Sequence, residues 1–326
     1  PLLDACAQGL TAAGAEVSVV HCSTATVTRT ELAARIPADL AGIVSLLALE
    51  ETPRADFAAV NSGLAANQNL VQALGDAESI APLWIVTCGA VESVTNPAQA
   101  QNWGLGRVVG LEHPERWGGL VDLPSVADER TIARLVAVLS GALGDEDQIA
   151  IRGNGLLGRR LEHAGAPQTK RVWAPQGTVL ITGGTGAIGG HVAHWMAERG
   201  AERIVLTSRS GAHADGRSSA RPDWPCRAQL WTSSRPTSLA RDVSGLVDRV
   251  AASGPQLRAV MHTAGSGQAT ALAETSVEQL SSMAAVKTAG TRHLDELTAD
   301  LDLDAFVLFS SISAVWAVAC SLATPR

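Results

Sequence analysis

The chain has 326 residues, of which 46% are hydrophobic and 17% are charged. This composition excludes a disordered chain, and the length suits two compact units. The formal net charge of −7 argues against unspecific attraction to nucleic acid or to an anionic membrane surface. Five cysteines, odd in number and without C-x-x-C spacing, indicate reduced thiols and a cytoplasmic location. The sequence contains no tyrosine, which excludes any mechanism that needs a phenol in the chain as written.

The first half alternates between predicted helices and predicted strands. Helical spacing of apolar residues covers Leu3–Ala15, Glu31–Ile36, about Ala55–Leu74 and the region near Glu129–Leu143. Strand patterns or continuous apolar runs cover Val17–Val20, Gly42–Leu49, Leu83–Thr87, Gly119–Leu123 and Gln148–Ile151. This alternation predicts an α/β fold with a parallel sheet that helices cover on both faces.

A second α/β unit is predicted after a polar linker. The stretch Glu162–Gln176 contains two prolines and no sustained period, so we expect a first unit over 1–164, a linker over 165–176 and a second unit over 177–326. The second unit opens with a strand, Gly177–Thr182, a helix, His191–Arg199, and another strand, Arg203–Thr207.

One uncharged run, Ala305–Pro325, has the length of a membrane span. It contains four serines, and its segment Phe306–Phe309 has the pattern of a buried parallel strand. We therefore expect no membrane-spanning segment, and no basic, apolar leader opens the sequence either.

The strand that ends at Thr182 runs into a glycine-rich loop. Gly184, Gly186 and Gly189 satisfy G-x-G-x-x-G between a predicted strand and a predicted helix. Such glycines allow a tight turn and a close approach of backbone to a pyrophosphate, while the helix N-terminus offers free N–H groups. A glycine-rich turn that binds nothing is the simpler alternative, but the strand and helix around the motif favour dinucleotide binding.

Arg209 indicates which dinucleotide is bound. It stands twenty residues after Gly189, just beyond the second strand, where an acidic residue would bind the 2′-hydroxyl of the adenosine ribose. An arginine suits a 2′-phosphate instead, so NADPH is preferred over NADH. A solvated arginine after a strand is the alternative.

The sequence resembles the ketoreductase domains of modular type I polyketide synthases, which are relatives of the short-chain dehydrogenases. Four blocks carry the resemblance: Gln101–Pro124, Asp147–Leu161, Gly177–Gly211 and Ala259–Ser313. The resemblance implies two tandem Rossmann-like subdomains, of which the first is structural and binds no cofactor and the second, here incomplete, binds NADPH. It also implies an acyl carrier protein with a phosphopantetheine-bound β-ketoacyl substrate, neighbouring synthase domains and a role in antibiotic biosynthesis. The family has a further strand before the helix that opens this chain, so we expect the N-terminal edge to be clipped.

The resemblance also implies the site residues. Its catalytic lysine and serine correspond to Lys287 and Ser311: the serine would hydrogen-bond the substrate carbonyl oxygen, and the lysine would hold the ribose and lower the pKa of a tyrosine. In isolation, a surface lysine and a turn serine would be the simpler interpretation. The expected cofactor-binding residues are Gly183, Gly184, Thr185, Gly186, Ala187, Ile188, Gly189, Ser208, Arg209, His262, Thr263, Ala264 and Gly265.

The sequence departs from the family at the proton donor. The family's tyrosine follows the serine by 13 residues, and this chain has Thr324 at that position. An aliphatic hydroxyl is a far weaker acid than a phenol, whose pKa is about 10. The chain also ends before the family's asparagine and cleft helices, so we expect it to reduce ketones poorly. A structural module and a redox-inactive epimerase of the synthase are the alternatives.

Two segments look foreign to the family and show no strand or helix period. They are Cys226–Ser244, where a third strand and an adenine-binding aspartate are expected, and Ala317–Arg326. We hypothesise that both are translations in a shifted reading frame of a high-GC gene. The shifted tail can read Gly-Ser-Gly-Leu-Gln-Pro-Gly-Tyr, which restores the tyrosine. DNA sequencing across both segments tests this, and an uninterrupted frame without a compensating shift would exclude it.

Two further features concern stereochemistry and metals. Trp316 stands eight residues before position 324, where A-type members of the family have a tryptophan, and the Leu-Asp-Asp signature of B-type members is missing after Gly265. An A-type domain is therefore expected, with Trp316 as a core residue the alternative. The histidines are not at metal-ligand spacing, so no metal site is predicted.

Overall fold

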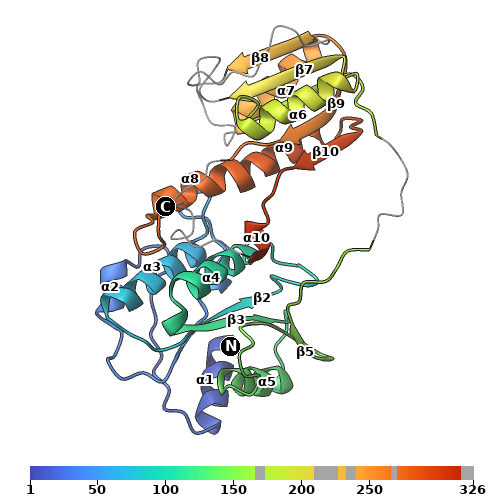
Figure 1. Ribbon diagram of the computed structural model, residues 1–326. Coiled ribbons are helices and arrows are strands. Elements are labelled where there is room, and N and C mark those ends of the chain that lie inside the picture. Colours follow the sequence, from blue (N-terminus) through green and yellow to red (C-terminus); the bar gives the residue numbers. More distant parts are fainter. Residues whose placement is uncertain (166–172, 209–226, 233–239, 266–269, 317–326) are drawn as a thin grey trace, which may run out of the picture. The chain divides into compact units, whose positions relative to one another are not determined.

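The computed structural model describes residues 1–165, 173–208, 227–232, 240–265 and 270–316. These residues form two compact units (Figure 1). The first unit contains the described residues of Pro1–Ala164, Ala269–Gln279 and Ile312–Arg326, and the second those of Gly165–Gln268 and Leu280–Ser311. The domain boundaries in the sequence stay a prediction. Among the described residues, no helix is long and apolar enough to cross a membrane.

The first unit is built on a five-stranded sheet of order β1-β2-β3-β4-β5, in which only the β4–β5 pair is antiparallel. Its strands are β1 (Ile43–Ser45), β2 (Leu83–Cys88), β3 (Trp117–Leu123), β4 (Gln148–Arg152) and β5 (Gly155–Gly158). Its helices are α1 (Leu2–Ala12), α2 (Arg29–Ala33), α3 (Ser62–Asp76), α4 (Ala100–Glu112), α5 (Glu129–Leu139) and α10 (Ser313–Trp316), with 3₁₀ turns at Leu47–Leu49 and Pro114–Arg116.

Helices cover both faces of this sheet because its central strands are apolar on both sides. Val121 and Leu123 of β3 pack in one cluster with Cys6 of α1 and Leu135 of α5. Leu120 points to the other face, where α4 comes so close that a Cβ on Gly106 would lie 2.8 Å from the Leu120 side chain.

Two elements predicted for this unit are wrong. Residues Val17–Val20 form no strand, and Val19 and Val20 are 42% and 51% exposed; a short apolar run becomes a strand only where a neighbouring strand can pair with it. Helix α3 begins at Ser62 rather than near Ala55, because an antiparallel bridge between Pro53 and Asn61 holds the preceding chain in a loop.

Other elements of this unit differ in extent or were missed. The apolar run from Gly42 is a strand only over Ile43–Ser45. The sequence did not predict α4, whose three glycines and buried Asn102 blur the apolar period. It also did not predict β5, which has four residues and pairs antiparallel at the edge of the sheet.

The second unit is built on an entirely parallel sheet of order β10-β9-β6-β7-β8. Its strands are β6 (Thr178–Thr182), β7 (Arg203–Ser208), β8 (Arg227–Thr232), β9 (Leu257–His262) and β10 (Ala305–Leu308). Its helices are α6 (Ala187–Glu198), α7 (Ala240–Ala252) and a continuous helix made of α8 (Val277–Ala284), a π-helical turn η4 (Ala285–Ala289) and α9 (Gly290–Thr298). The first three residues of α8, up to Gln279, are counted with the first unit.

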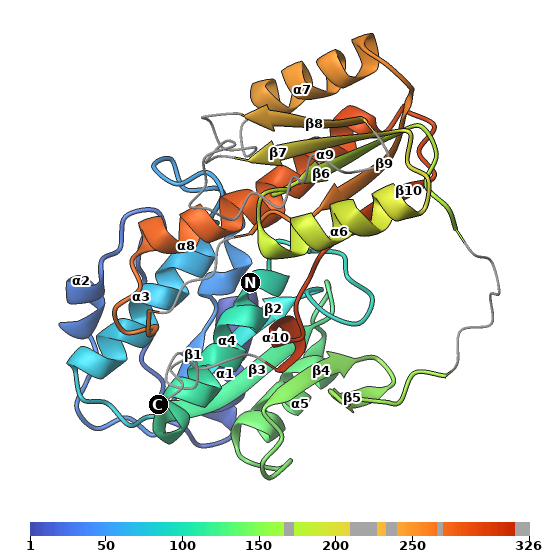
Figure 2. The ribbon, with the colours of Figure 1, turned by 45° about the horizontal axis from the view of Figure 1, so that its top comes forward.

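Alternating residues of β6 face opposite helix layers of the second unit. Val179 and Ile181 pack with Ala193 and Met196 of α6, whereas Leu180 packs with residues of α7 and α9. Figure 2 shows α6 on one side of the sheet and α7 on the other. At one edge, β10 leaves Val307 and Leu308 exposed by 38% and 47%.

The predicted fold class, α/β with two tandem Rossmann-like parallel sheets, is confirmed. The prediction that Cys226–Ser244 has no strand or helix character is wrong, because the segment contributes β8 and the start of α7. The edge of β7 offers a row of backbone partners to β8, and a sequence pattern cannot include this tertiary pairing. The tail Ala317–Arg326 lies outside the described residues.

The core of the second unit gives a stability prediction. Ile181 is 0% exposed and Ile188 is 54% exposed. Removal of a buried methylene costs about 1 kcal/mol, so Ile181→Val is expected to lower the free energy of unfolding by that amount. Ile188→Val makes the same chemical change at an exposed position and is expected to leave it unchanged. Urea titrations followed by circular dichroism measure both, and equal midpoints for the two variants would contradict the assigned core.

Candidate functional site

The strand order of the second unit contains a topological switch point at β6. The chain proceeds from β6 to β7 on one side, whereas β9 lies on the other side of β6. In open parallel sheets, ligands bind at such a switch point, beyond the carboxyl ends of the strands. Here the strands β6, β7 and β9 end at Thr182, Ser208 and His262.

The glycine-rich loop follows β6 at this switch point. Gly183 has φ +71°, which favours glycine, and a Cβ there would lie 2.7 Å from Cα of Ala264. The N–H of Gly184 donates to the carbonyl of Thr207 at 3.0 Å, and the N–H of Gly186 donates to the carbonyl of Gly183 at 2.9 Å. The loop is therefore fixed to the neighbouring strand ends.

Gly189 lets α6 approach the loop closely. A Cβ on Gly189 would lie 2.7 Å from Cα of Gly184 and even closer to the carbonyl oxygen of Gly183. Among the described residues, a Cβ on Gly186 would, in contrast, meet only the Gly183 carbonyl oxygen, at 3.2 Å. The outer side of the loop is thus open to a ligand, while its inner side is closed by the helix.

The first turn of α6 supplies hydrogen-bond donors. Gly186 is the N-cap residue, and no side-chain hydrogen bond caps the helix. Ala187 and Ile188 are exposed. The first N–H groups of a helix have no partner within the helix and carry its positive dipole end. The exposed Gly186 and a helix start without a side-chain cap together fit a dinucleotide pyrophosphate.

Ser208 and Thr185 meet beside this loop. The hydroxyl of Thr185 donates to Oγ of Ser208 at 2.6 Å, so the end of β7 is joined to the loop. Arg209, the residue expected to bind the 2′-phosphate, lies outside the described residues.

The segment His262–Gly265 lies on the other side of β6. His262 is 2% exposed, and its Nδ1 lies 2.6 Å from Oγ1 of Thr182. Burial lowers the pKa of His262, with a smaller contribution from the charge of Lys287. The backbone N–H and the hydroxyl of Thr263 both donate to the carbonyl of Thr182, at 3.1 and 2.7 Å.

Lys287 lies at the carboxyl ends of β9 and β10. Its Nζ donates to the carbonyl of Phe309 at 3.2 Å. A Cβ on Gly265 would lie 3.0 Å from both Cε and Nζ of Lys287, so the side chain passes directly over this glycine. Ser311 follows β10 two residues after Phe309 and is exposed. The structure therefore brings Lys287 to the segment that precedes Ser311 and to the turn after β9.

Sequence patterns alone did not identify Thr182 and Phe309 as part of this arrangement. The hydroxyl of Thr182 contacts His262, and its carbonyl accepts a hydrogen bond from Thr263. The carbonyl of Phe309 accepts a hydrogen bond from Lys287. The position of Thr182 directly before the glycines could have identified it. The role of Phe309 could not be predicted, because its backbone carbonyl is independent of residue type. Within the ranges that the structure covers, no three His, Cys, Asp or Glu side chains gather as a metal site would require.

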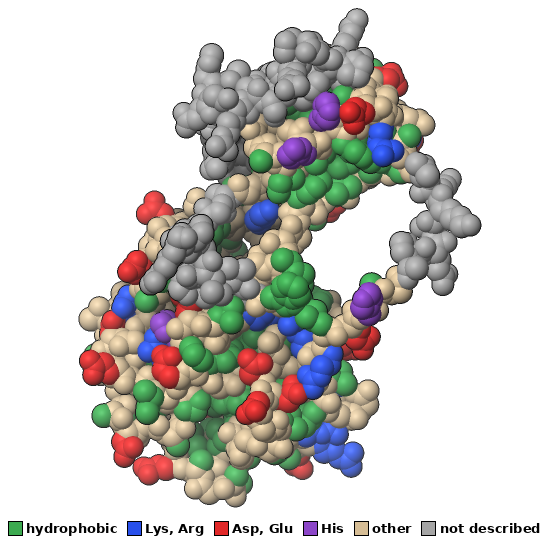
Figure 3. Space-filling model, in the orientation of Figure 1, with side chains coloured by type: hydrophobic (Ala, Val, Ile, Leu, Met, Phe, Trp, Pro, Cys, Tyr) green, Lys and Arg blue, Asp and Glu red, His purple; other side chains and the backbone are tan. Residues whose placement is uncertain are grey.

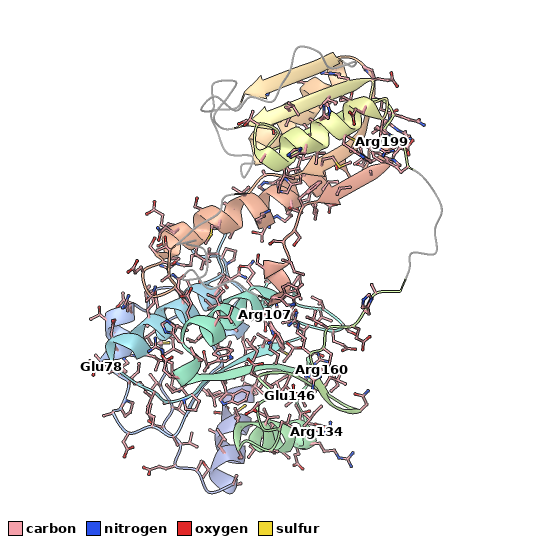
Figure 4. The ribbon with its side chains drawn as sticks, in the orientation of Figure 1. Glu78, Arg107, Arg134, Glu146, Arg160 and Arg199 are labelled. Carbon is pink, nitrogen blue, oxygen red and sulfur yellow. The ribbon has the colours of Figure 1, made fainter. Side chains whose placement is uncertain are left out.

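The outer face of α6 carries an aromatic stack away from the loop. The rings of Trp173 and Trp195 are stacked with centroids 6.2 Å apart, and the guanidinium of Arg199 lies 4.6 Å from the centroid of the Trp195 ring (Figure 4). Figure 3 shows histidine and hydrophobic side chains on the face that carries α6, to which the helix contributes the exposed residues His191 and His194.

Two family models match the chain. The model described as "KR domain" matches residues 177–322. The model described as "Polyketide synthase extender module SpnB, Rossmann fold domain" matches residues 5–161.

Relatives and solved structures agree with these matches. The chain is 48% identical to polyketide synthase GfsA of Streptomyces halstedii over 97% of this chain and 4% of that protein. It is 46% identical to the pikromycin polyketide synthase component PikAIII of Streptomyces venezuelae over 94% of this chain and 19% of that protein. A structure described as "Structure of A-type Ketoreductases from Modular Polyketide Synthase" matches with a TM-score of 0.84 and 42% identity, over 96% of this chain and 69% of the other. The chain thus spans a small part of these curated relatives and about two thirds of that structure.

Proposed function

Because the chain belongs to the ketoreductase domains of modular polyketide synthases, we propose that it is built to reduce a β-ketoacyl thioester with NADPH. The observation that carries the proposal is the glycine loop with its exposed Gly186 at the start of α6, placed at the switch point, with Lys287 at the ends of β9 and β10. The proposed substrate is carried by the phosphopantetheine arm of an acyl carrier protein, and neighbouring synthase domains are the proposed partners. We place this chemistry in the cytoplasm.

NADPH would supply the hydride, and the chain would hold it through residues on both sides of β6. The N–H groups of Ala187, Ile188 and Gly189 would bind the pyrophosphate, with Gly183, Gly184, Thr185 and Gly186 forming the turn around it. Ser208 and Arg209 would bind the ribose 2′-phosphate. His262, Thr263, Ala264 and Gly265 would line the side of the nicotinamide ribose.

Lys287 and Ser311 are the proposed catalytic residues. The Ser311 hydroxyl would donate a hydrogen bond to the substrate carbonyl oxygen and so stabilise the negative charge that grows there. The Lys287 ammonium would hold the nicotinamide ribose and add a positive charge near the same oxygen.

The proton that completes the reduction has no strong donor at the expected position. Thr324 stands where the resemblance requires a tyrosine, and the sequence contains none. Since an aliphatic hydroxyl protonates an alkoxide poorly, we propose that this chain binds NADPH but turns over slowly. The missing phenol equally favours a second candidate, a redox-inactive structural or epimerising module.

A titration combined with a turnover assay tests the proposal. NADPH is titrated into the protein by fluorescence, and its oxidation is then followed with a β-ketoacyl N-acetylcysteamine thioester. Binding with slow turnover supports the impaired reductase, whereas absence of binding supports the structural module. Loss of deuterium from an α-labelled thioester without NADPH oxidation identifies epimerisation.

The preference for NADPH gives a prediction at Arg209. A hydrogen bond between charged groups contributes about 1.5–3 kcal/mol, so Arg209→Ala is expected to weaken NADPH binding by roughly 10- to 100-fold. NADH lacks the 2′-phosphate, so its dissociation constant is expected to stay within twofold. Titration of both nucleotides measures this, and an equal loss for the two would show that Arg209 does not bind the 2′-phosphate.

A further inference from the structure

The helix that carries Lys287 contains a π-helical turn, Ala285–Ala289, between α8 and α9. In this turn the N–H of Gly290 donates to the carbonyl of Ala285, five residues back. In a regular α-helix the same N–H would donate to the carbonyl of Val286. The π turn therefore takes this α-helical donor away from the Val286 carbonyl, which belongs to the residue directly before Lys287.

His262 takes the place of the missing donor. Its Nε2 lies 3.1 Å from the carbonyl oxygen of Val286, and Val286 and His262 are only 6% and 2% exposed. A buried carbonyl without a partner would be destabilising by about 1–3 kcal/mol. The imidazole thus supplies a donor to this buried carbonyl at the π turn.

The contacts of the ring define its tautomer. A carbonyl oxygen only accepts, so Nε2 of His262 must carry a hydrogen. Burial lowers the pKa of His262, which favours the neutral ring, and in the neutral ring Nδ1 then accepts. The hydroxyl of Thr182, 2.6 Å away, is the donor to Nδ1.

Three hydrogen bonds connect His262 and Lys287 in a closed circuit. The side chain of His262 holds the carbonyl of Val286. The backbone carbonyl of His262 accepts from the N–H of Phe309 at 3.1 Å, and the carbonyl of Phe309 accepts from Nζ of Lys287 at 3.2 Å. One residue at the end of β9 therefore fixes both the backbone before Lys287 and the group that its ammonium contacts.

We propose that His262 is the positioning residue for Lys287, holding it through the Val286 carbonyl at the π turn. The importance of Lys287 for reduction rests on the proposed function, whereas the positioning itself can be measured without NADPH. Without the hydrogen bond from His262, the π turn would relax toward a regular α-helix. This relaxation would rotate the residues that follow the turn relative to those that precede it.

The sequence contains two lysines, Lys170 and Lys287, which makes the positioning directly measurable. The full chain is acetylated at pH 7 with trace amounts of acetic anhydride, and mass spectrometry gives the extent of labelling at each lysine. Lys170 serves as the internal reference. A lysine whose Nζ donates to a carbonyl reacts more slowly than a free one, because this hydrogen bond must break before the amine can attack the anhydride.

Three variants separate the hydrogen bond from the bulk of the ring. His262→Gln keeps a side-chain N–H at about the reach of Nε2, whereas the shorter His262→Asn reaches Thr182 but not Val286. His194→Gln, at an exposed position of α6, is the matched control for loss of a histidine. The labelling ratio of Lys287 to Lys170 is expected to rise at least threefold in His262→Asn and to stay within twofold of the original in the other two.

Each outcome supports or overturns the proposal. Equal ratios in His262→Asn and His262→Gln overturn it. A second measurement, the nitrogen chemical shifts of the His262 ring in the unaltered chain, covers the case in which the variants fail to fold: a ring without a hydrogen on Nε2 overturns the proposal, and a neutral Nε2–H ring supports it. Parallel NADPH titrations keep the two questions apart, since a chain that does not bind NADPH but shows the expected labelling pattern contradicts only the proposed function.

Discussion

Gly189→Ala is expected to weaken NADPH binding by about 10²-fold. The added Cβ would meet the backbone at Gly183 and Gly184, with 2.7 Å to Cα of Gly184. Backbone atoms cannot rotate away as a side chain can, so the start of α6 must move from the loop. A displacement near 1 Å in a binding arrangement costs about two orders of magnitude. Fluorescence titration with NADPH measures the loss.

Gly245→Ala is the matched control for this change. Gly245 lies in α7, and within the part of the chain that the structure describes a Cβ there would meet only the Arg249 guanidinium, at 3.6 Å. Its NADPH affinity is expected to equal that of the original chain. Circular dichroism of both variants separates a local displacement from unfolding. Unchanged NADPH affinity in folded Gly189→Ala would contradict the pyrophosphate position at this loop.

Restoring a phenol at position 324 is expected to raise turnover by about 10²–10⁴-fold, the usual contribution of general acid catalysis. The change replaces residues 317–324 by Gly-Ser-Gly-Leu-Gln-Pro-Gly-Tyr, the sequence that the shifted reading frame can encode. The reason is that the alkoxide formed on hydride transfer then meets an acid with a pKa of about 10 instead of an aliphatic alcohol. NADPH oxidation with a β-ketoacyl thioester measures the gain.

The same replacement with Phe in place of the final Tyr isolates the phenol hydroxyl. It repeats every other change in the segment, so it is expected to bind NADPH equally well and to stay slow. If both replacements turn over equally fast, position 324 does not carry the proton donor. If the Tyr version stays as slow as the Phe version, the cause of the slow turnover lies elsewhere in the chain.

The parts of the fold that could be predicted are those whose signal is local. The strand before Gly183 and the helix after it follow from a buried apolar run, a glycine motif and an amphipathic segment. The strand lies as expected, whereas the helix begins at Ala187, inside the glycine motif, rather than at the predicted His191. The continuous apolar patterns of β2 and β3 were equally clear. In each case the local pattern and the tertiary environment favour the same structure.

The remaining parts depend on contacts between distant residues. Val17–Val20 has a strand-like pattern but no strand beside it, whereas β8 forms in a segment without such a pattern because β7 pairs with it. The π turn at Lys287 is contacted by a histidine 25 positions earlier in the sequence. Hydrogen bonds of backbone carbonyls, such as those of Val286 and Phe309, are not encoded in residue type. The roles assigned to the site residues stay predictions until the variants above are measured.

The edge strand β10 has a practical consequence for all of these experiments. Its exposed valine and leucine, Val307 and Leu308, stand on a strand that lies at the edge of the sheet formed by the described residues. Such an edge invites a second copy to add on by strand pairing, and it favours precipitation during purification. Binding titrations therefore belong at low protein concentration, with light scattering recorded alongside. Val307→Lys places a charge on this edge strand and is expected to keep the protein monodisperse.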